Sequence, residues 1–358
     1  MLSEKVKIAL IGPYPPPFGG ISIHIQRLKE QLAKRGYNCV VYAIGAGSEF
    51  PQEDIKRIKN IKSWLPSYFM GAREDIIHLH CPSLPIRAII SLMGMLGRKT
   101  VITIHGASLE DSFSRGNWFK KQIIKFIMKQ FSFIIVLNSK MEEFASSLGV
   151  KRKRLQCVPS FIPPIIKESE IDDVPKEVWF FLDSHKPTVL ANASRIAFYN
   201  GEDLYGIDMC VDLCAALKQS YPKIGFVFCL PEISDYGYFE KIKQRIREKG
   251  IKENFLFQTK PCQMYPILKR SDLFVRPTNT DGYSISVAEA IYFKVPALAS
   301  DVCPRPQGAI LFKSRDINDL TLKAKDILDN YLFYKRQVED IEFEDNTEKI
   351  LGIYKQLI

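Results

Sequence analysis

The clearest structural signal in this chain lies at residues 271–301, which read SDLFVRPTNTDGYSISVAEAIYFKVPALASD. An apolar run ends at Pro277, a polar turn follows, and a helix is expected to start near Ser284. A second apolar run occupies residues 296–300. Strand, helix and strand in this order form a βαβ unit, so the segment predicts a parallel sheet.

The same alternation of strands and helices extends through the whole chain. In the first half the expected strands are 6–12, 38–44, 75–80, 100–105, 133–138 and 155–159. The helices between them are expected at about 20–35, 84–97, 117–130 and 139–148. In the second half the expected strands are 187–193, 225–230, 255–259, 272–277, 296–300 and 309–312. Helical patterns there lie near residues 206, 237, 263, 284 and 316.

The length of 358 residues exceeds the roughly 100–200 residues of one domain, so two domains are expected. Prolines bracket an acidic stretch at 165–186, which we interpret as a linker. The prediction is an N-terminal domain at 1–164 and a C-terminal domain at 187–358, each an α/β, Rossmann-like, doubly wound parallel sheet. The two sheets are expected to face each other across a ligand-binding cleft.

The net charge is concentrated in the first domain. The chain has 50 Lys and Arg against 40 Asp and Glu, and residues 1–164 hold 24 basic and 11 acidic side chains, whereas residues 165–358 hold 26 and 29. No apolar stretch is long enough for a membrane span or a secretory signal, so these classes are excluded. Eight cysteines without CxxC or disulfide-like spacing favour a cytoplasmic protein.

Two turns have the features of anion sites. Near Ser284 a helix would begin with unpaired N–H groups that can hold a phosphate. Asp281 and Glu289, eight residues apart, then offer carboxylate acceptors for sugar hydroxyls, a combination that suits a nucleotide-sugar. Gly19 and Gly20 also precede a helix and let backbone N–H groups approach an anion, although a plain strand-to-helix loop is an equal alternative.

Three histidines lie at the ends of expected strands. His78 and His80 share one face of their strand, while His105 ends the next strand and points into the expected cleft. The only carboxylate beside these strands is Asp75, so we expect no metal site. We expect His78 and His80 to be hydrogen-bonded histidines at the sheet edge, and we weigh function and structure equally for His105.

The segment with Asp281 and Glu289 resembles the E-x7-E signature of glycosyltransferase family 4, whose members are retaining enzymes with the two-domain GT-B fold. Asp281 stands at the first Glu position and Glu289 at the second. The resemblance extends to four further segments, at 17–20, 75–80, 104–106 and 193–195. The last helix of the chain is then expected to pack back on the N-terminal domain.

The resemblance implies roles for particular residues. Glu289 would bind the donor ribose, Asp281 the transferred sugar, and His105 would lie beside the reacting sugar. The donor-binding candidates are Gly19, Gly20, Arg195, Arg276, Asp281, Gly282, Tyr283, Ser284 and Glu289. The catalytic candidates are His105, Asp281 and Arg195. The family uses no protein nucleophile, metal or cofactor, so a UDP- or GDP-linked sugar would be the only small molecule required besides the acceptor.

Two departures from the family pattern concern the donor site. The family has a Lys-Gly shortly after the arginine, whereas Arg195 is followed by an extended segment and then Tyr205-Gly206, so the second phosphate cation is missing. We expect Arg276 or Arg305 to supply the lost charge, with a surface position of no consequence as the equal alternative. The other departure is Asp281, which is one methylene shorter than Glu.

A basic helix is expected at 117–130. Lys121, Lys125 and Lys129 form a stripe at i, i+4 and i+8, and Trp118 projects in the same direction. The arc expected to face the core holds Phe119, Ile123, Phe126, Ile127 and Phe131. The stripe suits an anionic membrane surface, although a merely solvated face is an equal alternative. No nucleic-acid motif accompanies the charge, so nucleic acid is not expected as a partner.

The resemblance implies a retaining, metal-independent hexosyltransferase, which is expected to act on a saccharide or polyprenyl-linked acceptor. It would lie peripherally on the inner face of the cell membrane, as in the assembly of capsule, exopolysaccharide or lipopolysaccharide. Two alternatives stay open. One is a nucleotide-sugar epimerase of similar fold. The other is a catalytically degenerate partner subunit, which is suggested by the departures from the family pattern at Tyr205 and Asp281.

Overall fold

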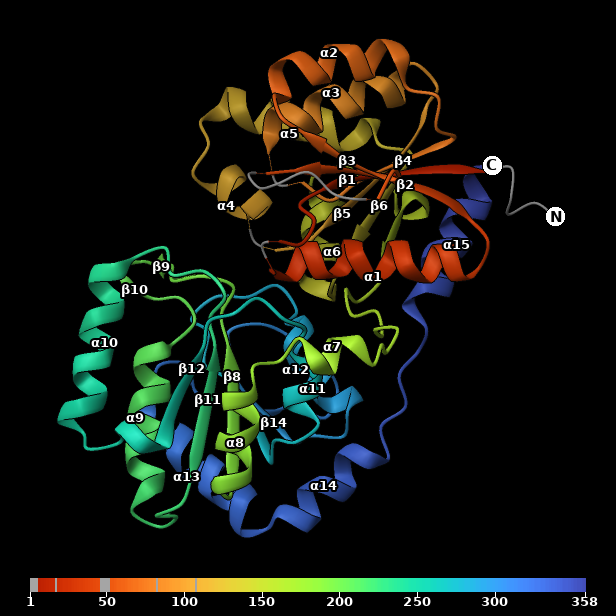
Figure 1. The fold of residues 1–358 in the computed structure, drawn as a ribbon. Helices are drawn as coiled ribbons and strands as arrows, with labels where there is room; N and C mark the ends of the chain where they lie inside the picture. The colour runs from red at the N-terminus through yellow and green to blue at the C-terminus, as the bar shows by residue number, and fades with distance from the viewer. Residues whose placement is uncertain (1–5, 17, 46–51, 82, 107) are drawn as a thin grey trace. The chain divides into compact units, whose positions relative to one another are not determined.

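The structure is a computed structural model that describes residues 6–16, 18–45, 52–81, 83–106 and 108–358. The chain divides into two compact units. The first is formed by Met1–Pro16, Ile21–Ile165 and Asp345–Ile358, and the second by Pro17–Gly20 and Ile166–Glu344. Each unit contains one parallel sheet with helices on its faces (Figure 1). The expected class of two parallel-sheet α/β domains is therefore confirmed.

The sheet of the first unit has seven parallel strands in the order β3-β2-β1-β4-β5-β6-β7. They are β1 (Lys7–Gly12), β2 (Asn38–Ile44), β3 (Ile55–Ile58), β4 (Ile76–Leu79), β5 (Lys99–Ile104), β6 (Phe133–Val136) and β7 (Leu155–Cys157). The interior strands β4 and β6 are buried at every position because helices cover both faces. The strand order reverses between β1 and β4, which is where ligands bind in such sheets.

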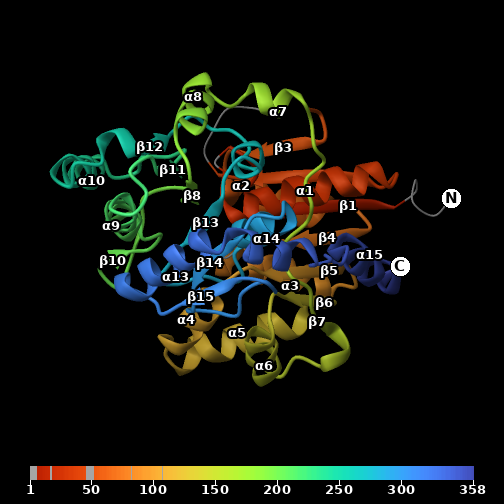
Figure 2. The ribbon, with the colours of Figure 1, turned by 90° about the horizontal axis from the view of Figure 1, so that it is seen from below.

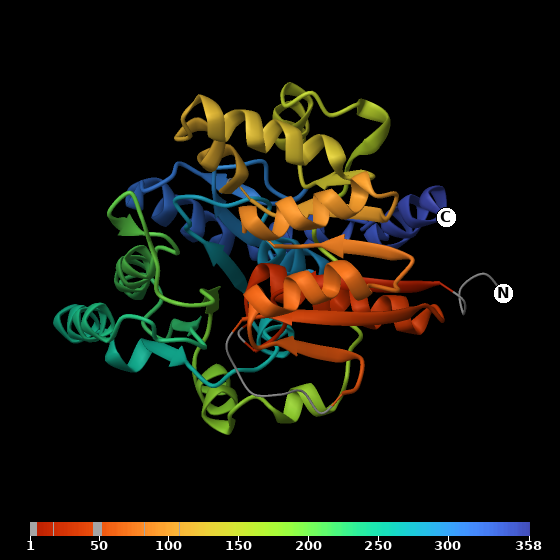
Figure 3. The same cartoon turned by 90° about the horizontal axis from the view of Figure 1, so that it is seen from above.

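Helices lie on both faces of this sheet. They are α1 (Gly20–Lys34), α2 (Ile61–Gly71), α3 (Leu84–Met95), α4 (Ser108–Ser114), α5 (Trp118–Gln130), α6 (Ser139–Ser147) and α15 (Asn346–Leu357). Ile25 and Leu28 of α1 share one core with Ile350 and Tyr354 of α15, so the end of the chain belongs to the first unit (Figure 2). Figure 3 looks onto the other face, which α2, α3 and α5 cover.

The second unit has a six-stranded parallel sheet in the order β12-β11-β8-β13-β14-β15. These strands are β8 (Thr188–Asn192), β11 (Gly225–Cys229), β12 (Phe255–Gln258), β13 (Leu273–Arg276), β14 (Ala297–Ser300) and β15 (Ile310–Phe312). A small antiparallel hairpin joins β9 (Phe198–Tyr199) and β10 (Glu202–Asp203). The order reverses at β8, between β11 and β13.

Two cores cover the two faces of this second sheet. The helices α9 (Ile207–Lys218), α10 (Tyr236–Glu248) and α13 (Ile317–Asp329) contribute to one core. The other core includes residues of α8 (Lys176–Ser184), α11 (Tyr265–Leu268), α12 (Ile285–Tyr292) and α14 (Tyr331–Glu339). The helices therefore flank the sheet on both sides, as a doubly wound sheet requires.

The interval 165–186, which we interpreted as a linker, contains α7 (Ser169–Asp172) and α8. Val178 and Leu182 of α8 are buried in the core of the second unit. The linker prediction rested on the acidic composition of 168–173. The buried apolar positions of α8 are spaced four residues apart and face the sheet. This interval is therefore part of the second unit rather than a bare connection.

The expected orientation of α5 is wrong for three of its residues. Phe119, Ile123 and Phe126 are 65%, 37% and 49% exposed, although they were expected to face the core. Ile127 and Phe131 are buried as expected, together with Ile124 and Met128. This buried set also has i, i+3, i+4, i+7 spacing, so α5 has two apolar arcs and the periodicity alone did not say which arc meets the sheet.

Among the described residues, none of the helices combines the length and hydropathy needed to span a membrane.

Candidate functional site

The carboxyl ends of β8 and β13 in the second unit bring together several residues singled out from the sequence. β8 ends at Asn192 and is followed by Arg195, while β13 ends at Arg276. These strands are hydrogen-bonded neighbours, with Ala191 opposite Val275. The turn after β13 leads into α12, which carries Glu289. The arrangement lies at the point where the strand order reverses, the usual place for a ligand in an open α/β sheet.

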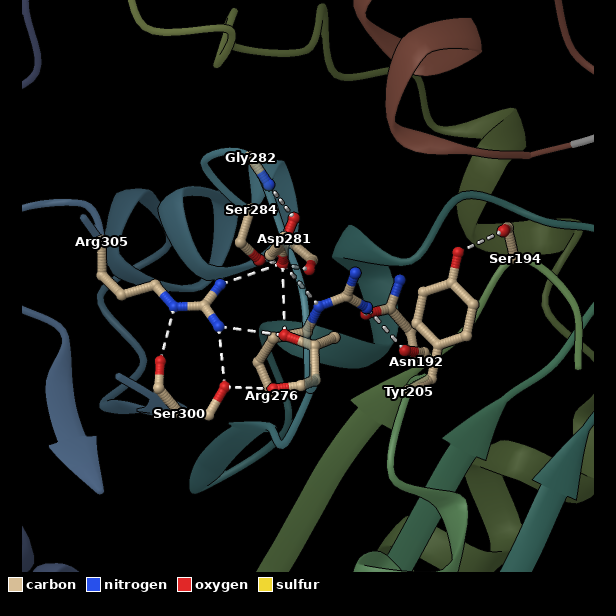
Figure 4. A network of polar contacts seen from close by, with 11 residues as sticks. Asn192, Ser194, Tyr205, Arg276, Asp281, Gly282, Ser284, Ser300 and Arg305 are labelled. Carbon is tan, nitrogen blue, oxygen red and sulfur yellow. Dashed lines mark hydrogen bonds and ion pairs between the residues drawn. The ribbon is translucent and has the colours of Figure 1, made fainter. Parts of the chain in front are cut away.

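Asp281 is the centre of a network of polar contacts in this turn (Figure 4). Its Oδ2 accepts a hydrogen bond of 2.9 Å from Nη1 of Arg305 and lies 3.4 Å from Nε of Arg276. Its Oδ1 accepts the backbone N–H of Gly282 at 2.9 Å. The side chain is only 16% exposed. Two guanidinium groups therefore share one carboxylate, which leaves an excess positive charge at the ends of the strands.

The pKa of Asp281 follows from these contacts. Burial alone would raise the pKa of this carboxyl group, because it disfavours the charged form. The charges of Arg276 and Arg305, together with the hydrogen bonds from Arg305 and Gly282, outweigh burial and hold the pKa of Asp281 below its ordinary value. Asp281 is therefore ionised at neutral pH.

Arg305 donates its hydrogen bonds to groups of the protein itself. Its Nε donates to the backbone carbonyl of Ser300 at 2.8 Å, and its Nη2 donates to the side chains of Thr278 and Ser300, both at 2.9 Å. The side chain is 1% exposed. Arg305 thus ties the turn after β13 to the end of β14 and holds Asp281 in place.

Arg276 is held differently from Arg305, because the described residues use only two of its three guanidinium nitrogens. Its Nη1 donates to the backbone and side-chain oxygens of Asn192 at 2.8 and 3.1 Å, and its guanidinium lies 5.0 Å from the ring centroid of Tyr205. Tyr205 in turn contacts the hydroxyl of Ser194 at 3.0 Å. Within the described part of the chain, Nη2 of Arg276 has no hydrogen-bond partner. A planar cation stacked and fixed in this way is suited to donate hydrogen bonds from Nη2 to phosphate oxygens.

The start of α12 lies beside this network. Ser284 is its N-cap residue and has φ 70°, a left-handed conformation that is uncommon for any residue other than glycine. Its side chain makes no capping hydrogen bond to the helix and instead lies 3.3 Å from the hydroxyl of Ser286. Glu289, one turn further along, is 4% exposed. The helix therefore begins without the side-chain cap that would compete with an anion for its first N–H groups.

The start of α9 shows the contrast. The carboxylate of Asp203 accepts hydrogen bonds from the N–H groups of Tyr205, Gly206 and Ile207 at 3.0, 3.1 and 2.9 Å. This carboxylate occupies the place that a phosphate would need, so α9 offers no anion site at its start. The hairpin that ends in Asp203 is the extended segment between Arg195 and Tyr205, and it accounts for the departure from the family pattern there.

Gly206 is required by close packing. It has φ 68°, and a Cβ at this position would lie 2.5 Å from the carbonyl oxygen of Pro277. Arg195 itself is exposed, and no hydrogen bond or ion pair ties it to the described part of the chain. Arg276 ends β13, and the other candidates of the second unit lie on the two segments that follow β8 and β13, namely Arg195, Asp281, Gly282, Tyr283, Ser284 and Glu289.

In the first unit, His80 and His105 follow β4 and β5 and are hydrogen-bonded through Nδ1 of His80 and Nε2 of His105 at 2.9 Å. His78 makes both of its hydrogen bonds, to the hydroxyls of Tyr354 at 2.6 Å and Thr103 at 2.8 Å, as expected. The expectation of a fully hydrogen-bonded His80 is wrong, because its buried Nε2 has no partner among the described residues.

His24 is a member of this cluster that the sequence analysis missed. It lies on α1, and its ring centroid is 5.2 Å from that of His80 and 4.9 Å from that of His105. Burial lowers the pKa of His24 to about 4, and it also holds the pKa values of His80 and His105 well below the ordinary value. All three rings are therefore neutral at physiological pH. No local sequence signal links them, because they come from three separate elements.

The loop that contains Gly19 and Gly20 leads into α1, the helix that carries His24. Gly20 is the first residue of α1, so Gly19 and Gly20 stand at a helix start as expected, while Pro17 in the same loop lies outside the described residues. A Cβ on Gly12 would lie 2.6 Å from Cδ1 of Ile25 and 3.1 Å from Cβ of His80. Glycine at the end of β1 therefore lets α1 and His80 approach each other closely.

Two family models match the chain. Residues 18–164 match the model described as Glycosyltransferase Family 4, and residues 183–341 match the model described as Glycosyl transferases group 1. A stretch of 98 residues is 29% identical to the lipopolysaccharide core biosynthesis mannosyltransferase LpsB of Rhizobium meliloti (strain 1021). That stretch covers 27% of this chain and 28% of the relative, so the chain matches LpsB over only about a quarter of its length.

Solved structures resemble the whole chain. Sucrose-phosphate synthase from Thermosynechococcus elongatus superposes with a TM-score of 0.73 at 15% identity, over 99% of both chains. The Anabaena protein HepE, solved in complex with UDP, has a TM-score of 0.65 at 12% identity, over 98% of both chains. At these identities the likeness establishes the fold.

Proposed function

Because the chain belongs to glycosyltransferase family 4 and has the GT-B fold, we propose that it is a retaining hexosyltransferase that uses a UDP- or GDP-linked sugar. The observation that carries the proposal is the network of Arg276, Asp281 and Arg305 beside the start of α12. HepE, which has the same fold, was solved with UDP, and this supports a nucleotide-linked donor.

In this proposal the second unit binds the donor diphosphate. Nη2 of Arg276 and the first N–H groups of α12 would contact phosphate oxygens, and Arg195 would add a second cation. These contacts strengthen as the sugar–phosphate bond breaks and negative charge grows on the leaving diphosphate, so they stabilise the transition state more than the bound substrate. Arg305 would act as a positioning residue, because its donors are already used within the protein.

The carboxylates would bind hydroxyl groups. Glu289 would accept from the ribose and Asp281 from the transferred sugar. Two arginines share Oδ2 of Asp281, so the lone pairs of the carboxylate that are not used by the protein would accept hydrogen bonds from the sugar. His105 would lie beside the reacting sugar and, being neutral, would contribute a hydrogen bond rather than a charge. The acceptor hydroxyl would attack from the side on which the diphosphate leaves, without a protein nucleophile or a metal ion.

A panel of UDP- and GDP-sugars in thermal unfolding measurements tests the donor proposal. A ligand at about 100 times its Kd stabilises a protein by about 2.7 kcal/mol, so the true donor class should raise the Tm clearly above the others. Incubation with that donor then separates the alternatives. Transfer only in the presence of an acceptor supports a transferase, whereas epimerised or free nucleotide product without acceptor supports an epimerase. Folded protein with no turnover supports a partner subunit.

We further propose that the acceptor is a lipid-linked saccharide and that the first unit contacts an anionic membrane surface. On α5, Trp118, Phe119 and Phe126 are 74%, 65% and 49% exposed. The helix α3 packs against α5, and its last residue Met95 and the Leu96 that follows it are exposed as well. The helix α5 has four lysines and no acidic residue. Exposed aromatic and aliphatic side chains next to lysines are the combination that binds the interface of an anionic bilayer. LpsB, which shares one segment with this chain, is a lipopolysaccharide enzyme.

Flotation with liposomes tests this surface. Phe119→Ser combined with Phe126→Ser should reduce the fraction of protein bound to vesicles that contain an anionic lipid. The matched control is Phe333→Ser, since Phe333 is 59% exposed on α14 of the second unit. Equal binding of the double variant and the wild type, or equal binding to neutral vesicles, would remove the support for a membrane role of α5.

A further inference from the structure

Three imidazole rings converge in the first unit, and the proposed transfer reaction uses only one of them, that of His105. His24 lies on α1, His80 follows β4 and His105 follows β5. One ring nitrogen of each lies within 4.8 Å of those of the other two. The centroids are 5.2, 4.9 and 5.2 Å apart, a nearly equilateral triangle. Three imidazoles bound to one tetrahedral ion, with metal–nitrogen bonds of about 2.0–2.1 Å, have centroids about 5 Å apart.

The hydrogen bond of His24 fixes which nitrogen faces the cluster as an electron-pair donor. Its Nδ1 lies 2.7 Å from the carbonyl oxygen of Ser160, and a carbonyl only accepts, so Nδ1 must carry the proton. A neutral ring then has a bare lone pair on Nε2. This atom is buried and has no hydrogen-bond partner among the described residues. An imidazole that donates from one nitrogen to a backbone carbonyl and offers the other is the usual state of a metal-binding histidine.

The remaining pair is consistent with the same chemistry. If Nδ1 of His80 donates to Nε2 of His105, then Nε2 of His80 is a second bare lone pair. This atom is also buried, and the described part of the chain offers it no partner. The opposite tautomer would bury an N–H group with no acceptor, which is rarer in proteins. In the favoured tautomer, Nε2 of His105 presents its lone pair to His80, and an ion would replace that single hydrogen bond.

We propose that His24, His80 and His105 form a binding site for a borderline divalent transition-metal ion, with Zn²⁺ as the reference ion. Neutral imidazoles without a carboxylate favour Zn²⁺, Co²⁺, Ni²⁺ and Cu²⁺ over Mg²⁺, Ca²⁺ and Mn²⁺. His24 and His80 are 2% and 1% exposed, whereas His105 is partly exposed and provides the approach from solvent. Three protein ligands leave a fourth position for water or another ligand. This site revises our sequence-based expectation of no metal, which overlooked His24.

Direct binding of Zn²⁺ to chelator-treated full-length protein tests the site. Calorimetric titration should show one Zn²⁺ per chain, and Co²⁺ in place of Zn²⁺ should give the visible absorption of a four-coordinate ion. His24→Ala and His105→Ala should each weaken Zn²⁺ binding at least about tenfold, because each removes a ligand. His185→Ala is the matched control, since His185 is the one histidine outside the first unit.

The outcomes separate clearly. His105→Ala keeps the test decisive if His24→Ala does not fold, because His105 is partly exposed. Wild-type protein that binds no stoichiometric Zn²⁺, or variants that bind it as tightly as the wild type, would overturn the proposal. Nucleotide-induced thermal stabilisation of the metal-free protein reports on the second unit alone, so the metal site and the proposed donor site can fail independently.

Discussion

Arg276 and Arg305 contact the same carboxylate, yet their surroundings give them different roles. Arg305 is 1% exposed and its three nitrogens are all hydrogen-bonded to the protein. Arg276 is 11% exposed and stacks on Tyr205, and its Nη2 has no hydrogen-bond partner among the residues that the structure describes. We therefore infer different roles for these two arginines from the number of hydrogen-bond donors that each already uses within the protein.

Arg276→Ala should weaken UDP binding at least about tenfold, because hydrogen bonds to charged groups contribute about 1.5–3 kcal/mol each. Arg276→Lys should recover only part of the loss, since a lysine keeps the charge but has neither the fork nor the planar stack. Calorimetry with UDP measures both. Arg270→Ala is the control, because Arg270 stacks on Trp179 outside the network. Unchanged UDP affinity in folded Arg276→Ala would show that this arginine does not contact the diphosphate.

The depressed pKa of Asp281 predicts how stability depends on pH. Its ionised form is favoured in the folded state, so it contributes stability above the ordinary carboxyl pKa of 3.8, and this contribution is lost as the pH falls through the lower folded pKa. Asp281→Asn lacks the titrating group. Urea unfolding between pH 3 and pH 7 should therefore show the wild type ahead at neutral pH, with the difference shrinking on acidification. A difference that stays constant over this range would contradict the ion-pair account.

The sequence predicted part of this site because the relevant residues are close in the chain. Asp281, Ser284 and Glu289 share one strand–turn–helix segment, and their spacing was sufficient to place them together. Asn192 and Ser300 contact the arginines from neighbouring strands, which only the strand order brings together. His24 was missed for the same reason.

The elements around the site show what periodicity can and cannot predict. The parallel strands were expected close to their observed positions, because β-branched runs bounded by glycine and proline are strong signals. The edge strand β3, with the sequence IKRI, and α2, which contains Pro66, were not expected. For α5, two apolar arcs of similar quality left the buried face undetermined.

The turn between β10 and α9 gives a prediction with a matched control. Gly206 and Gly250 have φ 68° and 65°, so alanine is strained at both positions. A Cβ on Gly206 would also lie 2.5 Å from the backbone of Pro277, whereas a Cβ on Gly250 would meet nothing within 4 Å. Gly250→Ala should cost about 1 kcal/mol of unfolding free energy, and Gly206→Ala clearly more. Gly206→Ala should also weaken UDP binding, because Pro277 follows Arg276. Equal losses of stability would mean that the turn relaxes around the added methyl group.

Viewed over the entire chain, the two units have similar sheets but different surfaces. The first holds 24 basic and 11 acidic side chains within residues 1–164, and the α5 surface adds exposed aromatic residues to that charge. The second carries the arginine network. The helix α15 returns to the first unit, where the hydroxyl of Tyr354 contacts His78, and this return was expected only from the family resemblance and not from the residues themselves. Such a return depends on packing between segments that are far apart in the chain.

The central claim is that this chain transfers a sugar with retention of configuration by using the arginine network of its second unit. The most direct measurement is an NMR assignment of the anomeric configuration of the product, made with purified protein, an α-linked UDP- or GDP-hexose and a lipid-linked saccharide acceptor. We predict an α-linked product, formed at least about tenfold more slowly by Arg276→Ala than by the wild type or Arg270→Ala. A β-linked product, or folded wild-type protein with no turnover on any donor of the panel, would contradict the account.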